Sequence, residues 1–219
     1  MAKIKKTNLY LGIAKFFTPI AIGLIVVYFA GLLIQESLRI RFWPLISAYF
    51  FPPLGKESII PTGIIVGIDP LIMALSIAFV DIIVALFLLW NYDLTKKIPL
   101  IGNFVIKVEN IGHNASDKYG WIKPLRFIGI VLFVMVPFQG SGGLVGSILG
   151  RLFGMKPLNT FFAISAGAIV GCLLIAYLTN EIKEVFLNNF LMGMLIVVIL
   201  LLIGIMVFIY RKNRDLEKN

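Results

Sequence analysis

The chain has 219 residues, of which 59% are hydrophobic and only 14% are charged, with a formal net charge of +9. Soluble domains carry about a quarter charged residues, so this composition excludes an ordinary water-soluble domain and indicates an integral membrane protein. The positive residues cluster beside apolar runs, which argues against nucleic-acid binding. The single cysteine, Cys172, excludes an internal disulfide, and the single histidine, His113, does not favour a metal site.

The hydrophobic segments predict an all-α polytopic membrane protein. In chain order they read as helix, hairpin, helix, basic loop, hairpin, helix and helix. Four of the runs reach the roughly 20 residues that a helix needs to cross a bilayer. These predicted full transmembrane helices are Phe16–Ile34, Pro70–Trp90, Pro157–Thr179 and Phe190–Tyr210.

Two further apolar runs, Phe42–Ile68 and Phe127–Gly154, are interrupted by "FPPLGKES" and "PFQGSGG". Each arm has roughly 11–13 residues, which covers about half of a bilayer at 1.5 Å per residue. A broken backbone that faces lipid leaves N–H and C=O groups unpaired, so the break must be shielded by protein or line a cavity. We therefore predict two re-entrant helical hairpins. The alternative is that each run is a kinked full span.

Positive charge is concentrated in the N-terminal segment, in the loop 91–126 and in the tail 211–219. With four crossings and two hairpins all three fall on one membrane face, and the positive-inside rule makes both termini cytoplasmic in the cell membrane. We expect an interfacial helix in the loop. No polar linker divides the chain, so we predict one membrane domain, 1–219, made of helix–hairpin–helix (1–90), loop, hairpin–helix–helix (127–210) and tail.

An internal repeat links the two hairpins, because four glycine or proline positions recur at a spacing of 87 residues. On the predicted topology the two units enter the membrane from opposite faces, which makes them an inverted repeat, typical of secondary transporters. The corresponding pairs are Gly55 and Gly142, Gly63 and Gly150, Gly67 and Gly154, and Pro70 and Pro157.

Glycines also form a ridge in the second hairpin, where they recur every four residues from 142 to 154. Residues at this spacing share one helix face and allow another backbone to approach closely, including that of a homo-oligomer partner. The segment lacks a nucleotide-binding pattern, so its glycines predict packing and not chemistry. The predicted hairpin and packing residues are Pro61, Gly63, Gly67, Pro137, Gly140, Gly142, Gly146, Gly150 and Gly154.

Ionisable residues inside apolar segments are the candidate functional residues, because they are costly in a membrane and tend to mark transport pathways. Glu57 in the first break, Asp69 before the next helix and Asp81 halfway along that helix are the proton-coupling candidates. Arg151 in the second hairpin is the anion-binding candidate, since its planar donors suit phosphate or carboxylate. The structural alternatives are a helix cap for Asp69, a partner for an internal polar group for Asp81, and a surface-reaching side chain for Arg151. No catalytic set accompanies them, so we expect neither an enzyme nor a cofactor.

The stretches "ESIIPTGIIVGIDP" and "KYGWIKPLRFIGIVLFVMVPFQGSGGLVGSILGRLFGMK" resemble motifs of the small multidrug export family, over roughly residues 55–178. The family's Arg-Gly after the glutamate is here Ser58-Ile59, and Gln139 stands where a proline is expected. That family is similar to the DedA/VTT superfamily, whose fold has two re-entrant hairpins packed against membrane helices. The matching positions are Glu57, Pro61, Gly63, Lys118, Tyr119, Gly120, Pro137, Gly140, Gly142, Gly146 and Gly154.

The resemblance implies proton-dependent transport or flipping of lipid phosphates, with acidic and arginine residues of the hairpins essential, here Glu57 and Arg151. The substrate-binding candidates are Arg151, Gln139 and Ser141. Our preferred hypothesis is a proton-coupled secondary transporter or flippase of an amphipathic anionic substrate, such as a polyprenyl or phospholipid phosphate, with membrane lipids as partners. The alternatives are efflux of small cationic or hydrophobic compounds and a non-transporting membrane scaffold. We expect Arg151, Glu57 and Asp81 to converge on one cavity between the hairpin tips.

Overall fold

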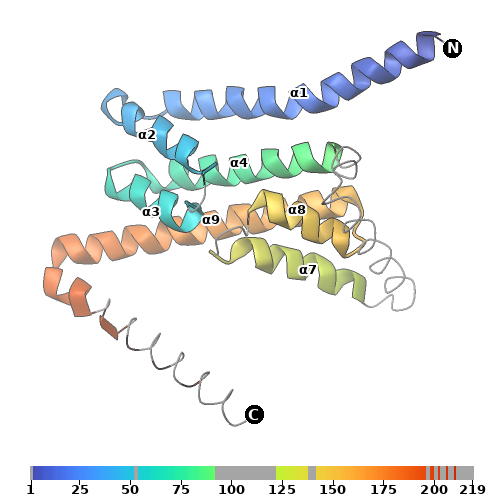
Figure 1. Ribbon diagram of the computed structural model, residues 1–219. Coiled ribbons are helices and arrows are strands. Elements are labelled where there is room, and N and C mark those ends of the chain that lie inside the picture. The colour runs from blue at the N-terminus through green and yellow to red at the C-terminus, as the bar shows by residue number, and fades with distance from the viewer. Residues whose placement is uncertain are drawn as a thin grey trace. The chain divides into compact units, whose positions relative to one another are not determined.

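The computed structural model describes residues 2–51, 54–91, 122–137 and 142–195, together with a few helical positions further on (198–199, 202, 206 and 210). Within these ranges every regular element is a helix, which confirms the predicted all-α class (Figure 1). The predicted interfacial helix and the basic tail lie outside the described residues. Contacts divide the chain into two compact units, Met1–Tyr177 and Leu178–Asn219, and each is considered by itself.

Three helices of the described part are long and apolar enough to cross a membrane. They lie in α1 (Ala2–Leu32), α4 (Pro70–Trp90) and α9 (Pro157–Asn188). The protein is therefore membrane-embedded, and three of the four predicted spans are present. The fourth, Phe190–Tyr210, lies largely outside the described residues.

The first helix ends two residues before its predicted limit, because the chain turns there into α2 (Glu36–Ala48). Arg39 of α2 closes this end. Its Nε donates to the Gly31 carbonyl at 3.1 Å and its Nη2 donates to the Ile34 carbonyl at 3.2 Å. A side chain of the following helix thus satisfies carbonyl groups that a helix end leaves unpaired.

The first predicted break separates α2 from α3 (Lys56–Ile65). Arg41, close to the middle of α2, donates through Nη1 to the carbonyl of Val66, which ends α3, at 3.3 Å. This long side chain links α2 to the end of α3 that lies away from the break, so α2 and α3 form a hairpin whose tip is the break. α2 starts six residues before the predicted Phe42, since Glu36 favours the positive end of a helix.

The second predicted break separates α7 (Ile122–Met135) from α8 (Gly143–Leu152). Arg126 of α7 donates through Nη1 to the carbonyl of Phe153, which ends α8, at 2.6 Å. The open ends of this pair are therefore joined in the same way as those of α2 and α3. Each of the four short helices spans only about half of a bilayer.

The turn that leaves the first hairpin is a Schellman motif, in which backbone bonds close the end of a helix. The N–H of Ile68 donates to the Gly63 carbonyl at 2.9 Å, and the N–H of Gly67 donates to the Ile64 carbonyl at 3.1 Å. Gly67 has a φ of 100°, a conformation that glycine adopts without steric cost. Pro70 then opens α4, where its missing N–H has no helical partner to lose.

The second hairpin ends in the same motif, 87 residues later. The N–H of Met155 donates to the Gly150 carbonyl at 3.0 Å, Gly154 has a φ of 69°, and Pro157 opens α9. The helix contacts match too: a methyl group on Gly63 would lie 2.7 Å from Met73 of α4, and one on Gly150 would overlap Thr160 of α9. The repeated spacing in the sequence is therefore a repeated structure in the described turns.

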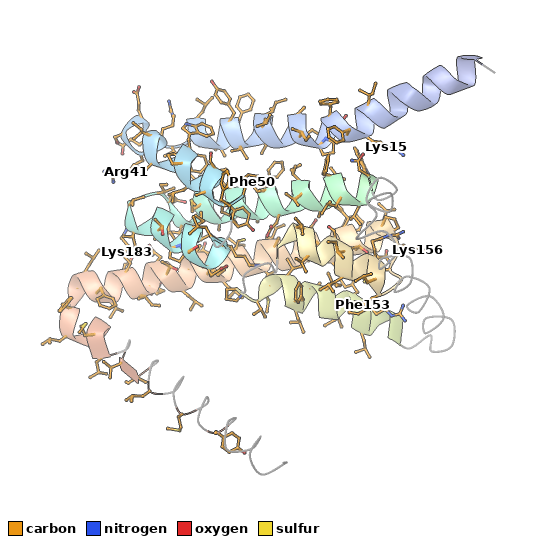
Figure 2. The ribbon with its side chains drawn as sticks, in the orientation of Figure 1. Lys15, Arg41, Phe50, Phe153, Lys156 and Lys183 are labelled. Atoms are coloured by element: carbon orange, nitrogen blue, oxygen red, sulfur yellow. The ribbon has the colours of Figure 1, made fainter. Side chains whose placement is uncertain are left out.

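The two hairpins open toward opposite ends of the first unit. Figure 1 shows α4 and the beginning of α9 running in opposite directions, each leaving its own hairpin. In Figure 2 Arg41, at the open end of the first hairpin, lies at one end of the unit, and Phe153, at the open end of the second, lies at the other. Phe50, at the tip of the first hairpin, lies between them. The tips therefore point toward the middle of the unit.

Helix α9 continues to Asn188, so the predicted end at Thr179 and the predicted link Asn180–Asn189 were wrong. The link is rich in the good helix formers Glu and Lys, and the Asn180 amide bonds to Glu184 one turn later at 3.2 Å. In the second unit the chain turns at Asn189, whose side-chain oxygen accepts from the N–H of Met192 at 3.4 Å. Residues 190–195 are again helical.

Helices α7 and α9 pack backbone to backbone at Gly167 and Gly171. A methyl group on Gly167 would lie 2.6 Å from the Val131 carbonyl oxygen, and one on Gly171 would lie 2.6 Å from the Met135 carbonyl oxygen. Four residues separate the two glycines, so they share one face of α9. This contact fixes α7 against the long helix that follows it.

We predict that Gly171→Ala lowers the free energy of unfolding by about 1–3 kcal/mol, because the added methyl would press on α7 backbone atoms that cannot rotate away. Gly129→Ala is the matched control, since nothing lies within 4 Å of that position in α7. It should be neutral or stabilise by up to about 1 kcal/mol through helix propensity. Thermal unfolding in detergent measures both. Equal effects of the two changes would contradict the packing of α7 on α9.

Candidate functional site

The candidate site lies at the middle of α4, around Asp81. This residue follows the first residue of α4 by eleven positions and precedes the last by nine, and its side chain is only 3% exposed. An Asp so far from either end of a spanning helix cannot reach a membrane surface. It is therefore retained only where other groups of the protein compensate its charge.

Both hairpin tips bond to the same oxygen of Asp81. Oδ1 accepts a hydrogen bond from the Tyr49 hydroxyl at 2.8 Å and another from the backbone N–H of Gly143 at 2.9 Å. Tyr49 ends α2 and Gly143 begins α8. One carboxylate oxygen thus connects three helices that are far apart in the sequence.

Glycine at the second tip allows this contact. A methyl group on Gly142 would lie 2.5 Å from Asp81 Oδ1 and 3.1 Å from the Tyr49 hydroxyl, and one on Gly143 would overlap the Asp81 backbone. The N-terminus of α8 therefore touches α4 directly. The partial positive charge of a helix N-terminus stabilises a nearby carboxylate. Gly146, the next glycine of the ridge and one turn further along α8, faces Val134 and Ile164.

Lys56 at the start of α3 is the cation of the site. Its side chain is 2% exposed, and its Nζ donates to the carbonyl of Val134 in the last turn of α7. It also interacts electrostatically with Asp81. The sequence analysis missed both Lys56 and Tyr49. A signal for Lys56 was present, since it is a cation inside a break between two apolar helices and next to Glu57.

Glu57 is half-buried and folds back over Gly55, where a methyl group would overlap its carboxylate. Its charge and that of Asp81 both act on the Tyr49 hydroxyl. Within the described residues Glu57 Oε2 and Asp81 Oδ2 are buried and have no hydrogen-bond partner. A buried oxygen of this kind is costly unless it meets a proton, a water molecule or a ligand. The described part of the chain shows no group of three or more His, Cys, Asp or Glu suited to hold a metal.

Arg151 does not join this cluster. It lies in the last turn of α8, eight residues from Gly143 and about 12 Å away along the helix axis at 1.5 Å per residue. Its Nη1 donates to the Met155 carbonyl at 3.0 Å, in the turn that leaves the hairpin. The expected convergence of Arg151 with Glu57 and Asp81 is therefore wrong, because the side chain belongs to the open end of the hairpin and not to its tip.

Of the other candidates, the structure describes Asp69, Pro61 and Pro137. Asp69 caps α4: its Oδ1 accepts from the N–H groups of Leu71 and Ile72 at 2.9 and 3.0 Å, which is the structural alternative. Pro61 lies inside α3, and Pro137 follows the end of α7 by two residues. The candidates outside the described residues are Gln139, Gly140 and Ser141.

A cavity of about 1090 Å³ lies beside the cluster, between α1, α2 and α4. Its wall is apolar almost throughout, and Phe50, Val80 and Leu144 belong to it. Each of these three residues is the sequence neighbour of a member of the cluster or of its glycine tip. The cavity and the carboxylate therefore lie at the same level of α4, but Asp81, Tyr49, Lys56 and Glu57 are not among the residues that line the cavity.

Comparison with known proteins identifies one family. A family model described as "Putative small multi-drug export protein" matches residues 57–174, which is more than half of the chain. The match begins at Glu57, the second residue of α3, and continues through α4, α7 and α8 to residue 174, a little beyond the middle of α9. No curated protein and no solved structure matches the chain.

We predict that Tyr49→Phe lowers the free energy of unfolding by about 1.5–3 kcal/mol, the range for a hydrogen bond to a charged group. In an Asp81→Asn background the same change should cost only about 0.5–1.5 kcal/mol, because the acceptor is then neutral. Denaturant unfolding of the four proteins in a double-mutant cycle gives the difference. Tyr177→Phe, at an exposed position of α9, is the control. Identical losses in both backgrounds would show that Tyr49 and Asp81 are not coupled.

Proposed function

We propose that this chain, which belongs to the family of small multi-drug export proteins, is a secondary transporter. It exports small amphipathic compounds in exchange for protons. The observation that carries this proposal is Asp81, a buried carboxylate at mid-membrane that bonds to the tips of two helical hairpins. Binding sites at the junction of opposed, broken helices are the plan of many secondary transporters.

The carboxylates Asp81 and Glu57 are the proposed proton carriers. Each has one buried oxygen without a hydrogen-bond partner within the described residues, so a proton can bind there without displacing another group. Protonation removes a negative charge from the membrane interior, where charge is costly. Exchange of a proton for a substrate at the same carboxylates couples the two movements.

The charge of the site favours a cationic substrate over an anionic one. Lys56 is opposed by two carboxylates, so the cluster has a formal excess of one negative charge. Arg151, on which the anionic preference depended, lies at the other end of α8. A lipophilic cation compensates this excess when the carboxylates are ionised, and protons compensate it when the cation has left.

Transport or flipping of a lipid phosphate is the second candidate, and Lys56 is the observation that favours it. A buried lysine at the tip of the first hairpin can bind a phosphate as a compact point charge. We propose with this candidate that the family is related to the DedA/VTT superfamily. The paired hairpins support that relation.

We propose that both hairpins are re-entrant and that the chain crosses the membrane fully four times, with both termini cytoplasmic in the cell membrane. The joined open ends of each hairpin support entry and exit on one face, and the opposite directions of α4 and α9 support an inverted repeat. The broken tips meet inside the protein, which shields their backbone from lipid.

Transport by the purified protein in vesicles tests the proposed function. We expect wild-type protein to move tetraphenylphosphonium, a lipophilic cation, against an imposed pH gradient. Asp81→Asn and Glu57→Gln should each reduce the pH-driven rate by about tenfold or more, equivalent to at least about 1.4 kcal/mol in the barrier. Asp69→Asn is the matched control, because asparagine caps a helix as well as aspartate does.

A polyprenyl phosphate as a second cargo separates the two candidates. If wild type moves this anion and not the cation, and a folded Lys56→Met variant loses that movement, the lipid-phosphate candidate holds and the export proposal is wrong. If wild type moves neither compound, the scaffold alternative is favoured.

A labelling experiment tests the topology. In a Cys172→Ala background, Ser37→Cys at the start of α2 should react with an impermeant maleimide from outside the cell. Asn114→Cys, in the central loop, should react only after the membrane is opened, because two re-entrant hairpins keep this loop with the termini. Labelling of Asn114→Cys from outside would make at least one hairpin a true span.

A further inference from the structure

Three basic residues meet at the open end of the second hairpin. They are Arg126 of α7, Arg151 of α8 and Lys156, which directly precedes α9. The two arginines donate to the carbonyl groups of Phe153 and Met155, in the turn that Lys156 ends. Lys156 is exposed, and it lies at the same end of the unit as Phe153 (Figure 2). We call these three residues the basic patch.

The basic patch has no acidic residue beside it among the described residues. The first hairpin differs, because the charges at its open end are balanced by two residues of each sign. These are Glu36, Arg39, Arg41 and Asp69. The other acidic residues described in the first unit, Glu57 and Asp81, belong to the cluster at the hairpin tips. The open end of the second hairpin therefore carries an excess of positive charge over the part of the chain that the structure describes.

The internal repeat shows how this excess arises. Lys156 stands where the first repeat has Asp69, 87 residues earlier. Asp69 accepts hydrogen bonds from the first N–H groups of α4, whereas the side chain of a lysine cannot accept any. Within the described residues the corresponding N–H groups of Leu158 and Asn159 have no hydrogen-bond partner. A cation at the positive end of a helix is unfavourable, and an anion from outside the chain would compensate it.

Exposed apolar side chains adjoin the basic patch. Leu125, Ile128 and Leu132 of α7 are each about half exposed, and their spacing of three and four residues places them on one side of the helix. This apolar stripe starts beside Arg126 and runs from the open end toward the tip of the hairpin. Leu158, next to the patch in α9, is exposed as well. The surface therefore suits an anion that has a long apolar part, and inorganic phosphate has none.

The patch also lies at the level expected for lipid head groups. Helix α4 ends at the same end of the unit at which α9 begins (Figure 1). Its last residue is the exposed Trp90, and tryptophan is enriched where a membrane meets water. On the topology proposed above this end is cytoplasmic, and the cytoplasmic leaflet carries anionic lipids that attract basic residues.

We infer that the basic patch binds the phosphate head group of an anionic membrane lipid, whose acyl chain lies along the apolar stripe of α7. Such a lipid contacts α7, α8 and the beginning of α9 together, so it stabilises the open end of the second hairpin. The inference goes beyond the proposed function and does not depend on it. The patch lies at the other end of α8 from Gly143, and none of its residues lines the apolar cavity.

Two phospholipids with the same acyl chains test the inference. Native mass spectrometry of the purified protein in detergent measures how many lipid molecules are retained. We expect phosphatidylglycerol to bind at least about fivefold more tightly than phosphatidylcholine, which has no net charge. Equal binding of the two lipids would overturn the inference.

Inorganic phosphate distinguishes a lipid from a free anion. We expect an excess of phosphate to leave phosphatidylglycerol bound, because phosphate makes no contact with the apolar stripe. Displacement of the lipid by phosphate would show that the patch takes a free anion, and the assigned lipid would then be wrong.

The variant Lys156→Asp copies the first repeat and tests the place of binding. It should weaken phosphatidylglycerol binding by about tenfold or more and leave phosphatidylcholine binding within about twofold. Its melting temperature without added lipid should equal or exceed that of wild type, because the new carboxylate can cap α9 as Asp69 caps α4. A folded Lys156→Asp protein that keeps its preference for phosphatidylglycerol would overturn the inference.

Lys15→Asp is the matched control. It reverses an exposed charge at the same end of the unit, but on α1 and outside the basic patch (Figure 2). It should leave phosphatidylglycerol binding within about threefold of wild type. Equal losses in Lys15→Asp and Lys156→Asp would indicate a diffuse attraction to the whole charged end, and the assigned site would be wrong.

Discussion

The first unit depends on one acceptor atom, Oδ1 of Asp81. A helix that stops inside a membrane leaves N–H and C=O groups without water to satisfy them, and two such helices end at the middle of α4. Tyr49 from one tip and Gly143 from the other both donate to this oxygen. Removing it would leave the N-terminus of α8 without this partner, and only the contact of Lys56 with the Val134 carbonyl, among the hydrogen bonds described above, would still join the two hairpins.

The same requirement explains most of the charged residues that the unit places near helix ends. Arg39, Arg41 and Arg126 each donate to carbonyl groups at the C-terminus of another helix, as Lys56 does. Asp69 accepts hydrogen bonds from the N–H groups at the beginning of its own helix. Each charge is thus stabilised by a helix end of opposite partial charge. Within the described residues, Glu57 Oε2 and Asp81 Oδ2 are the carboxylate oxygens of the site that remain without a hydrogen-bond partner.

The elements that local patterns determine were predictable from the sequence. The two breaks, the glycine turns and the mid-helix position of Asp81 follow from runs of apolar residues and from the special conformation of glycine. Lys56 was not found, because its partner Val134 is 78 residues away and periodicity describes only a residue's own helix. The arginine contacts at the open ends were missed for the same reason.

Arg151 shows how a correct pattern can be applied to the wrong position. Arg151 is near the glycine-rich break in the sequence, which suggests a position at the hairpin tip. The alignment of the two repeats shows instead that it lies at the open end. At the spacing of 87 residues Arg151 corresponds to Ile64, one residue before the end of α3. Each hairpin has a tip and an open end, and only the alignment of the two repeats distinguishes them. The end of α9 differs from the prediction because the hydropathy falls at the polar residues after Thr179, whereas Glu and Lys there extend the helix well.

The two carboxylate oxygens of Asp81 differ in their contacts. Oδ1 holds the hairpins, and Oδ2 has no partner within the described residues. A carboxylic acid protonated on one oxygen keeps the acceptor lone pairs of the other. In the proton exchange proposed above, protonation of Asp81 at Oδ2 therefore leaves the hydrogen bonds of Oδ1 with Tyr49 and Gly143 in place.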